Sequence, residues 1–320
     1  MNRCNRHCRC CSEKFSHRPW FGFMSHSEDM SPPTPPVLPE FDTTWRAVTW
    51  SEANKEKMLK KLKEFQLRTP EVNYLRILLH GPVGAGKSSF INSVNTVLQG
   101  YNTAGALVDA ATGKSFTTKF KIHRLKKDGP GSYYPFVFSD IMGLEQGHSE
   151  GVHTDDIISI LEGHVRNGYI FNPVCPLAKD NPNYNSNPSL KHRVHCLVSV
   201  VPADKISLAS DEVIQKMRTV REKARNLDIP QVVIMSMVDK ACPLVQEDLK
   251  KIYTSKKIKE KMQECSDKLG VPMNCIFPVK NYHEEVTNDL QLDVLILMAM
   301  TNIIMFANDF VEEQICIDIE

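Results

Sequence analysis

The residues of this chain with the clearest capacity for chemistry lie in one glycine-rich octapeptide, residues 81–88. Its letters are Gly-Pro-Val-Gly-Ala-Gly-Lys-Ser, which fit the pattern G-x-x-x-x-G-K-[ST]. In that pattern backbone N–H groups surround a phosphate chain, the lysine reaches the terminal phosphates and the hydroxyl ligates Mg²⁺. We therefore expect Lys87 on the β- and γ-phosphates and Ser88 on the metal. The predicted phosphate-binding residues of the loop are Gly81, Val83, Gly84, Ala85, Gly86, Lys87, Ser88 and Ser89.

The sequence on either side of the octapeptide suits this chemistry. Residues 74–80 are a nearly continuous apolar run, typical of a buried parallel strand, and residues 88–98 have apolar positions at helical spacing. The helix N-terminus would add its partial positive charge at the phosphates. A glycine-rich turn without function is the alternative. A second Gly-Lys-Ser at 113–115 does not fit the pattern, because Val108 stands where glycine is needed.

A companion acid is needed to hold the metal. Residues 135–140 read as a strand that ends in Asp140, and Gly143 follows three residues later. We expect Asp140 to bind Mg²⁺ and the Gly143 N–H to contact the γ-phosphate. The alternative is that Asp140 is an ordinary turn aspartate. Its place at the end of a strand, downstream of a phosphate loop, favours the metal-binding role.

Base identity depends on the residues that follow the strand expected at 231–236. Small GTPases read guanine with [Asn/Thr]-Lys-x-Asp, whose aspartate accepts the guanine N1–H and amino protons. Here residues 236–239 are Ser-Met-Val-Asp, which keep the aspartate and replace the lysine. We expect Asp239 to read guanine, with an aspartate that caps the next turn as the alternative. A backbone N–H at Lys280 is expected to meet the guanine O6.

The residues for catalysis are less clear. Leu144 follows Gly143, where a water-orienting Gln would assist hydrolysis. Polar side chains near this position are Glu145, Gln146 and His148. Candidates for a threonine that closes over Mg²⁺ and the γ-phosphate are Thr112, Thr117 and Thr118. The sequence does not choose among them, so the catalytic residue is unknown and slow turnover is expected.

The composition is that of an ordinary soluble globular protein, with 320 residues, 42% hydrophobic and 24% charged. A net charge of +1 argues against a protein held on nucleic acid or an anionic membrane by bulk charge. Six of the ten cysteines are scattered singly, which suits reduced cytoplasmic thiols. Polar residues interrupt the apolar segment 292–310, so we expect a core helix and no transmembrane segment.

Residues 1–44 are rich in Cys and Pro, and we expect them to form a disordered leader. The other four cysteines crowd into its first eleven residues, at Cys4, Cys8, Cys10 and Cys11. Zinc binding, acylation and an unmodified tail are all open, and we place no metal there.

Strand-like and helix-like patterns alternate along residues 45–320 after an early hairpin. Strands are expected at 74–80, 115–125, 135–140, 195–201, 231–236 and 274–279. Helices are expected at 45–67, 88–98, 154–165, 210–227, 246–252, 255–269 and from about 290. A loop insertion is expected at 166–192. This order predicts a three-layer α/β P-loop NTPase fold of the Ras-like G-domain type: a mostly parallel six-stranded sheet with one antiparallel edge strand and helices on both faces.

Three segments, 45–46, 75–94 and 140–145, resemble the interferon-induced protein 44 family, including its 44-like members. Residues 189–196 and 281–282 are similar too, so that the resemblance covers roughly residues 45–310. It implies a cytoplasmic, interferon-inducible protein with a GTPase-like domain, linked to antiviral and immune responses.

Two departures from the family limit what the resemblance implies. Mammalian relatives typically carry a TLDc-type domain ahead of the nucleotide domain, where this chain offers only the short leader. Functions of that domain are therefore not carried over. Family members can also show Thr-Lys-Val-Asp at 236–239, so Met237 weakens the expectation of guanine selectivity but not of phosphate binding.

The leading hypothesis is a guanine-nucleotide-binding switch or scaffold that uses GTP or GDP with Mg²⁺ and hydrolyses GTP weakly. Its loops at 101–118 and 143–153 would be ordered by the γ-phosphate. The partners would be unidentified proteins, or other copies of the chain in a nucleotide-dependent association. The alternatives are a P-loop ATPase or base-promiscuous NTPase, and an interaction module with vestigial nucleotide binding that uses residues 166–192.

Overall fold

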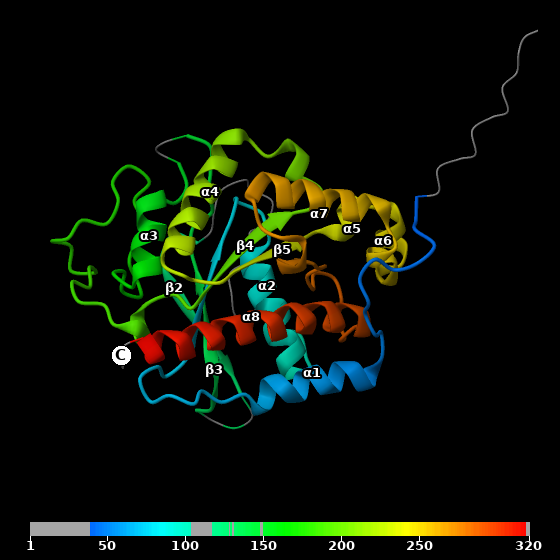
Figure 1. The fold of residues 1–320 in the computed structure, drawn as a ribbon, viewed down its shortest axis with the longest axis horizontal. Coiled ribbons are helices and arrows are strands. Elements are labelled where there is room, and N and C mark those ends of the chain that lie inside the picture. The colour runs from blue at the N-terminus through cyan, green and yellow to red at the C-terminus, as the bar shows by residue number, and fades with distance from the viewer. Residues whose placement is uncertain (1–38, 104–116, 128, 130, 148–149, 318–320) are drawn as a thin grey trace, which may run out of the picture. The chain divides into compact units, whose positions relative to one another are not determined.

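A six-stranded sheet with the strand order β2-β3-β1-β4-β5-β6 forms the centre of the fold (Figure 1). The strands are β1 (Leu75–His80), β2 (Lys121–Lys126), β3 (Tyr133–Asp140), β4 (Cys196–Pro202), β5 (Gln231–Ser236) and β6 (Ile276–Pro278). Five strands run parallel, and β2 pairs with β3 in the antiparallel direction at the edge. This arrangement confirms the predicted sheet and its early hairpin.

The computed structural model describes residues 39–103, 117–127, 129, 131–147 and 150–317, which belong to one unit that begins at Pro39. The expectations for residues 1–38, including the cysteine cluster, and for Thr112 and His148 lie outside this part of the chain.

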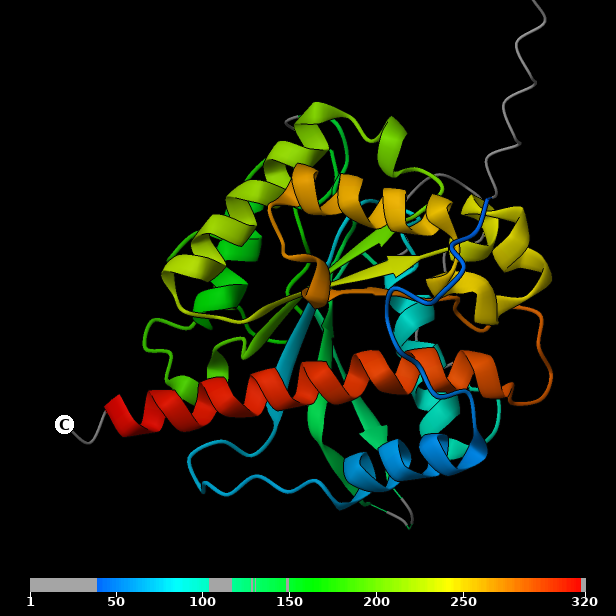
Figure 2. The same cartoon turned by 45° about the vertical axis from the view of Figure 1, so that its right-hand side comes forward.

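Helices cover both faces of the sheet, which gives three layers (Figures 1 and 2). The α-helices are α1 (Glu52–Glu64), α2 (Lys87–Gln99), α3 (Thr154–Glu162), α4 (Asp211–Asn226), α5 (Val238–Ala241), α6 (Pro243–Glu247), α7 (Lys256–Leu269) and α8 (Leu290–Ile317). Short 3₁₀ turns lie at Leu190–His192, Ile206–Leu208, Leu249–Tyr253 and Met273–Cys275. Helix α8 packs against α1 and α2 on one side, while α4 packs against α3 and α7 on the other. Figure 2 shows α8 (red) and α1 (blue) on the lower side of the view and α4 (yellow-green) and α7 (orange) on its upper side.

Serine side chains cap three of these helices where the sequence changes from loop to helix. The hydroxyls of Ser51, Ser210 and Ser255 accept the N–H groups of Asn54, Val213 and Ile258 at 3.2–3.3 Å. Each bond satisfies one of the N–H groups that a helix N-terminus leaves unpaired. Helix α2 has no such side-chain cap.

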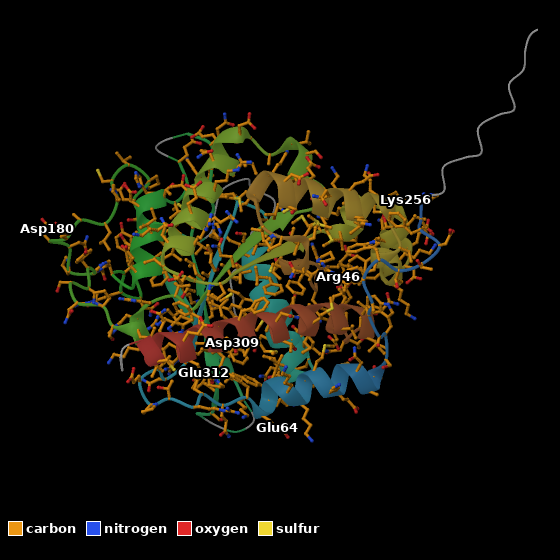
Figure 3. All side chains as sticks on the ribbon, in the orientation of Figure 1. Arg46, Glu64, Asp180, Lys256, Asp309 and Glu312 are labelled. Atoms are coloured by element: carbon orange, nitrogen blue, oxygen red, sulfur yellow. The ribbon has the colours of Figure 1, made fainter. Side chains whose placement is uncertain are left out.

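The helix expected at 45–67 is shorter than predicted, because tertiary contacts hold its first residues out of helical geometry. Arg46, which is labelled in Figure 3, donates to the carbonyls of Ile276 and Met273 at 2.7 and 2.6 Å. The ring of Trp45 packs edge-on against Tyr253, with centroids 5.0 Å apart. These contacts join residues far apart in sequence, so no local pattern announces them.

Residues 39–44, which the sequence assigns to the leader, pack against the segment before α7. Phe41 N–H donates to the Thr254 carbonyl at 2.8 Å, and Glu40 forms an ion pair with Lys251 at 3.0 Å. The described unit therefore starts ahead of the expected boundary at 45.

The prediction of a helix at 246–252 is wrong. Helix α6 ends at Glu247, and Asp248 takes an extended conformation in which its carboxylate accepts the Lys250 N–H at 3.0 Å. That bond starts a new 3₁₀ turn in place of a continued helix.

The strand expected at 115–125 begins only at Lys121 in the described residues. Just before it, Phe120 N–H donates to the Tyr169 carbonyl at 2.7 Å, and the Thr118 carbonyl accepts from Phe171 at 3.0 Å. This stretch therefore pairs with the insertion 166–192 and not with β3. Buried Asp156 holds the insertion in turn, because it accepts the Leu177 N–H at 2.6 Å.

One helix of the described residues, α8, is long and apolar enough to cross a membrane by length and composition, with a mean hydropathy of 1.9. In the structure 61% of its most apolar window is buried. Fully buried Asp293 binds Lys55 of α1 at 3.0 Å and the Tyr282 hydroxyl at 2.7 Å. These contacts place α8 in the core of the unit.

His195 lies fully buried just before β4, in a fixed neutral state. Its Nδ1 accepts the Arg76 N–H at 3.0 Å, so the proton sits on Nε2, which donates to the Leu190 carbonyl at 3.0 Å. Burial lowers the pKa of His195 to about 4, opposed by the bond to Leu190 and assisted by the charge of Arg76. A second proton would face a backbone N–H.

We predict that His195 makes the unit less stable in acid. Its pKa is about 4 when folded and about 6.5 when unfolded. Between these values the unfolded chain binds more protons, so the free energy of unfolding falls as the pH drops. The slope due to this one residue approaches about 1.4 kcal/mol per pH unit.

The measurement is urea unfolding from pH 7 to pH 4. His195→Gln keeps an acceptor and a donor without a titrating group, so it should flatten the profile by about that slope. The same substitution at exposed His283 is the control. An unchanged profile in His195→Gln would contradict the prediction.

Candidate functional site

The glycine loop 81–86 joins the end of β1 to the start of α2, as the sequence predicts. Gly81 has φ +144°, and a Cβ there would lie 2.1 Å from the Val200 carbonyl oxygen of β4. No other residue fits at this position without moving the neighbouring strand. The loop therefore lies directly against the sheet at the carboxyl ends of β1 and β4, where parallel α/β sheets bind ligands.

Side chains from three elements hold the carbonyl groups of this loop. Lys87 Nζ donates to the Gly81 and Pro82 oxygens at 3.1 and 2.9 Å. Ser236, at the end of β5, donates to the Ala85 oxygen at 2.6 Å. Asn281, after β6, donates to the Gly86 oxygen at 3.3 Å.

This capture of carbonyls sets the direction of the amides. In a trans peptide the N–H points opposite to the C=O, so fixing the Ala85 oxygen also fixes the N–H of Gly86. Among the described residues, the N–H groups of Gly84, Gly86, Ser88 and Ser89 have no acceptor. Together with the uncapped N-terminus of α2, they form a cradle for an anion.

Val83 differs from the other loop residues in how its amide is used. Its N–H donates to the Leu144 carbonyl at 3.1 Å, and Leu144 returns a bond to the Gly81 oxygen at 3.0 Å. This two-bond bridge ties the loop after Gly143 to the glycine loop. In this arrangement the Val83 N–H is already bonded, so it is not available for the predicted phosphate contact.

Buried His80 is the last residue of β1 and directly precedes the glycine loop. Its Nε2 lies 2.7 Å from the Ser199 hydroxyl. Burial and then the charge of Lys87 lower the pKa of His80 to about 3. The imidazole near the Lys87 ammonium is therefore neutral. Lys87 itself is only 8% exposed.

Asp140 and Ser88 meet where the metal is predicted. Ser88 Oγ donates to Asp140 Oδ2 at 2.8 Å. Asp140 is 2% exposed, and its Oδ1 has no hydrogen-bond partner among the described residues. A buried carboxylate oxygen without a donor suits a cation. The Ser88 hydroxyl and the Asp140 carboxylate suit Mg²⁺, which takes few carboxylates and completes its shell with phosphate and water. The described residues hold no group of three or more His, Cys, Asp or Glu that could bind a metal by themselves.

Two further side chains surround Asp140. Thr117 Oγ1 lies 3.4 Å from Asp140 Oδ2, and Thr118 is exposed. His123 Nε2 lies 3.9 Å from the same oxygen, and burial lowers its pKa against the opposing effect of Asp140. The sequence named Thr117 but missed His123. The alternating pattern of β2 could have identified His123 only if the register between β2 and β3 had been known.

Gly143 packs directly against the glycine loop. A Cβ on Gly143 would lie 2.4 Å from Val83 Cγ2 and 2.8 Å from its backbone N. Leu144 is 1% exposed. Neither Leu144 nor Val83 brings a polar group that orients water.

The loop after Leu144 is fastened to α4 by two residues that the sequence did not single out. Lys216 Nζ donates to the Glu145 and Gly147 carbonyls at 2.8 and 2.6 Å. Glu212 accepts the Gly147 N–H at 2.8 Å. Helical spacing in the α4 sequence gives no sign of this role.

The residues predicted to read the base lie at the ends of β5 and β6. Asp239 is partly exposed in the short helix α5, which follows Met237 in a left-handed conformation with φ +56°. Lys280 Nζ forms an ion pair with Glu285 at 2.6 Å. Burial works against the charge of Lys280, but Glu285 and, more weakly, Asp239 raise its pKa. The two predicted residues are therefore electrostatic neighbours.

No protein-family model matches the chain. Interferon-induced protein 44 of Homo sapiens is 35% identical over 259 residues, which are 81% of this chain and 58% of that protein. The Mus musculus protein of the same name is 33% identical over 80% of this chain and 60% of its own length. Interferon-induced protein 44-like of Homo sapiens is 30% identical over 81% and 57%. The chain thus spans somewhat more than half the length of these curated relatives.

Solved structures resemble the chain loosely. Toc33 from Arabidopsis thaliana in complex with GDP and Mg²⁺ has a TM-score of 0.44 and 12% identity, over 78% of this chain and 90% of that one. A probable GTP-binding protein, engB, has a TM-score of 0.40 and 14% identity, over 73% and 99%. The fold assignment rests on the strand order and the glycine loop of this chain.

We predict that Gly81→Ala destabilises the unit by at least about 2 kcal/mol more than Gly84→Ala. Gly81 has φ +144° and Gly84 has φ +71°, so both variants force an alanine into a backbone conformation that L-residues rarely adopt. Only at Gly81 does the new Cβ meet backbone, since nothing lies within 4 Å of one at Gly84. Urea unfolding of the two variants measures the difference. Equal losses would show that the loop does not lie against β4 as described.

Proposed function

Because this chain is homologous to the interferon-induced protein 44 and 44-like proteins over 81% of its length, we propose that it binds a guanine nucleotide with Mg²⁺ and hydrolyses GTP slowly. In this proposal it is an interferon-inducible, cytoplasmic protein of the immune and antiviral response, in which the nucleotide acts as a switch. The observation that carries the nucleotide assignment is the orphaned Asp140 Oδ1 next to Ser88, at the mouth of the amide cradle.

The phosphates would lie against the loop amides. Gly84, Gly86, Ser88 and Ser89 supply N–H donors without acceptors, and α2 adds the partial charge of its N-terminus. Lys87 would supply the ammonium, already oriented by the Gly81 and Pro82 carbonyls. Preorganised donors of this kind avoid the cost of reorganisation on binding.

The metal would be held by Ser88 and Asp140. Mg²⁺ bound there neutralises negative charge on the β- and γ-phosphate oxygens. The Ser88–Asp140 hydrogen bond places the two oxygens next to each other in advance. Thr117 lies close enough to Asp140 to be the threonine that closes the site.

Slow hydrolysis follows from the apolar residues around the γ-phosphate position. The side chain of Val83 packs on Gly143, and Leu144 is buried where a glutamine would orient the attacking water. Low turnover would keep the triphosphate bound for long periods, as a switch needs.

Guanine selectivity rests on Asp239. Ser236 donates to the Ala85 carbonyl of the glycine loop and lies two residues before α5, the turn that carries the aspartate. Met237 replaces the lysine that packs along the base, and its flexible thioether can contact a purine face without selecting it. For this reason a base-promiscuous NTPase is the second candidate.

The test is isothermal titration of GTPγS and ATPγS, each with Mg²⁺. We predict tighter binding of GTPγS, since Asp239 accepts two guanine N–H groups that adenine lacks. Asp239→Asn should weaken GTPγS by about tenfold or more and leave ATPγS unchanged. The matched control is Asp228→Asn, at an exposed residue before β5.

Two results would contradict the proposal. Equal affinities for GTPγS and ATPγS would refute guanine selectivity and support the base-promiscuous enzyme. If Lys87→Ala bound both nucleotides with unchanged affinity, the proposed phosphate-binding role of the glycine loop would be refuted.

A further inference from the structure

A second basic site lies at the other end of β1 from the glycine loop. It is a half-open hollow of about 470 Å³ between β1, β2 and the segment that follows α3. Its chemistry comes from Tyr74, Arg76, Arg124, Arg166, Asn185 and His192, which are all part of its lining. A hollow of this volume is in the range of small-molecule sites.

The sheet register brings two of the arginines together. Val137 of β3 pairs with Arg76 of β1 on one side and with Arg124 of β2 on the other. Side chains in register point to the same face of a sheet. Both guanidinium groups lie over the ring of Tyr74, at 5.1 and 5.2 Å from its centroid.

These positive charges have no carboxylate partner in the described part of the chain. Arg76 donates from Nε to the Lys191 carbonyl at 2.7 Å and from Nη2 to the Tyr74 hydroxyl at 3.2 Å, which leaves Nη1 without an acceptor. Arg166 donates to the Pro182 carbonyl at 3.1 Å. Glu162, which precedes the hollow in sequence, is already paired with Lys223 at 2.7 Å.

The hollow therefore concentrates positive charge. Burial lowers the pKa of Arg76, with Tyr74 acting against this effect and Arg124 adding to it. Burial, Arg76 and Lys191 together lower the pKa of His192. Like charges held together without a counter-charge cost stability, and a bound anion would offset that cost.

We propose that this hollow binds a compact phosphate-bearing anion, either free phosphate or the phosphate group of a small molecule. Arginine presents a rigid fork of donors that matches phosphate oxygens, and three arginines line this hollow. Asn185 also lines it, with its side-chain amide donating to the Gly163 carbonyl at 3.1 Å. The site is separate from the glycine loop, because Arg76 lies near the start of β1 and the loop follows its end. The proposal does not depend on the nucleotide assignment.

The first test is isothermal titration of orthophosphate into Lys87→Ala protein at constant ionic strength, so that the glycine loop does not contribute. We expect saturable binding that weakens about tenfold in Arg124→Gln and again in Arg166→Gln. Arg193→Gln removes the same charge from an exposed neighbour outside the hollow, and it should leave the affinity unchanged. Equal loss in all three variants, or none in any, would overturn the proposal, and so would acetate that binds as tightly as phosphate.

The second test needs no variant. Crystals of the full chain are soaked in tungstate, a heavy phosphate analogue, and its position is found by anomalous scattering. We expect a peak within hydrogen-bond distance of Arg76 and Arg124. A peak at the glycine loop alone, or none, would overturn this proposal. The glycine-loop peak reports on the nucleotide site independently.

Discussion

The fixed carbonyl groups of the glycine loop are the constraint on which the rest of the site depends. Lys87, Ser236 and Asn281 each donate to a loop oxygen, and they come from α2, the end of β5 and the segment after β6. The C=O and N–H of one peptide group point in opposite directions, so the hold on the Ala85 and Gly86 oxygens fixes the N–H directions of Gly86 and Lys87. The protein itself therefore orients these amides before any ligand arrives.

The same loop is tied to the segment that would respond to a γ-phosphate. The Val83–Leu144 bridge joins them directly, and Lys216 of α4 holds the next turn of that segment by its carbonyls. In the proposed function, a ligand that competes for the Val83 amide or displaces Gly143 would have to break these bonds, and it would thereby move the segment. Val83 and Leu144 are apolar, whereas fast hydrolysis would need polar groups at these positions. Apolar residues here suit a slow switch.

Much of the fold and the position of the glycine loop could be predicted from the sequence, because both depend on local patterns. Buried parallel strands are apolar runs; the octapeptide follows one of them directly, and Asp140 is the last residue of another. What could not be predicted depends on contacts between distant residues. Arg46 is not helical because it donates to carbonyls near β6. The strand order and register bring Ser236, Asn281 and His123 to the site. Their residue types alone are common in loops and edge strands.

Hydrogen–deuterium exchange of the loop amides tests the central claim most directly. The amides of Gly84, Gly86, Ser88 and Ser89, which lack acceptors in the structure, should exchange much more slowly once Mg²⁺ and GTPγS are added. Amides in the middle of α7, already paired within the helix, should exchange at the same rate with and without nucleotide. If the loop amides exchanged equally fast in both conditions, they would not hold phosphate and the account would be wrong.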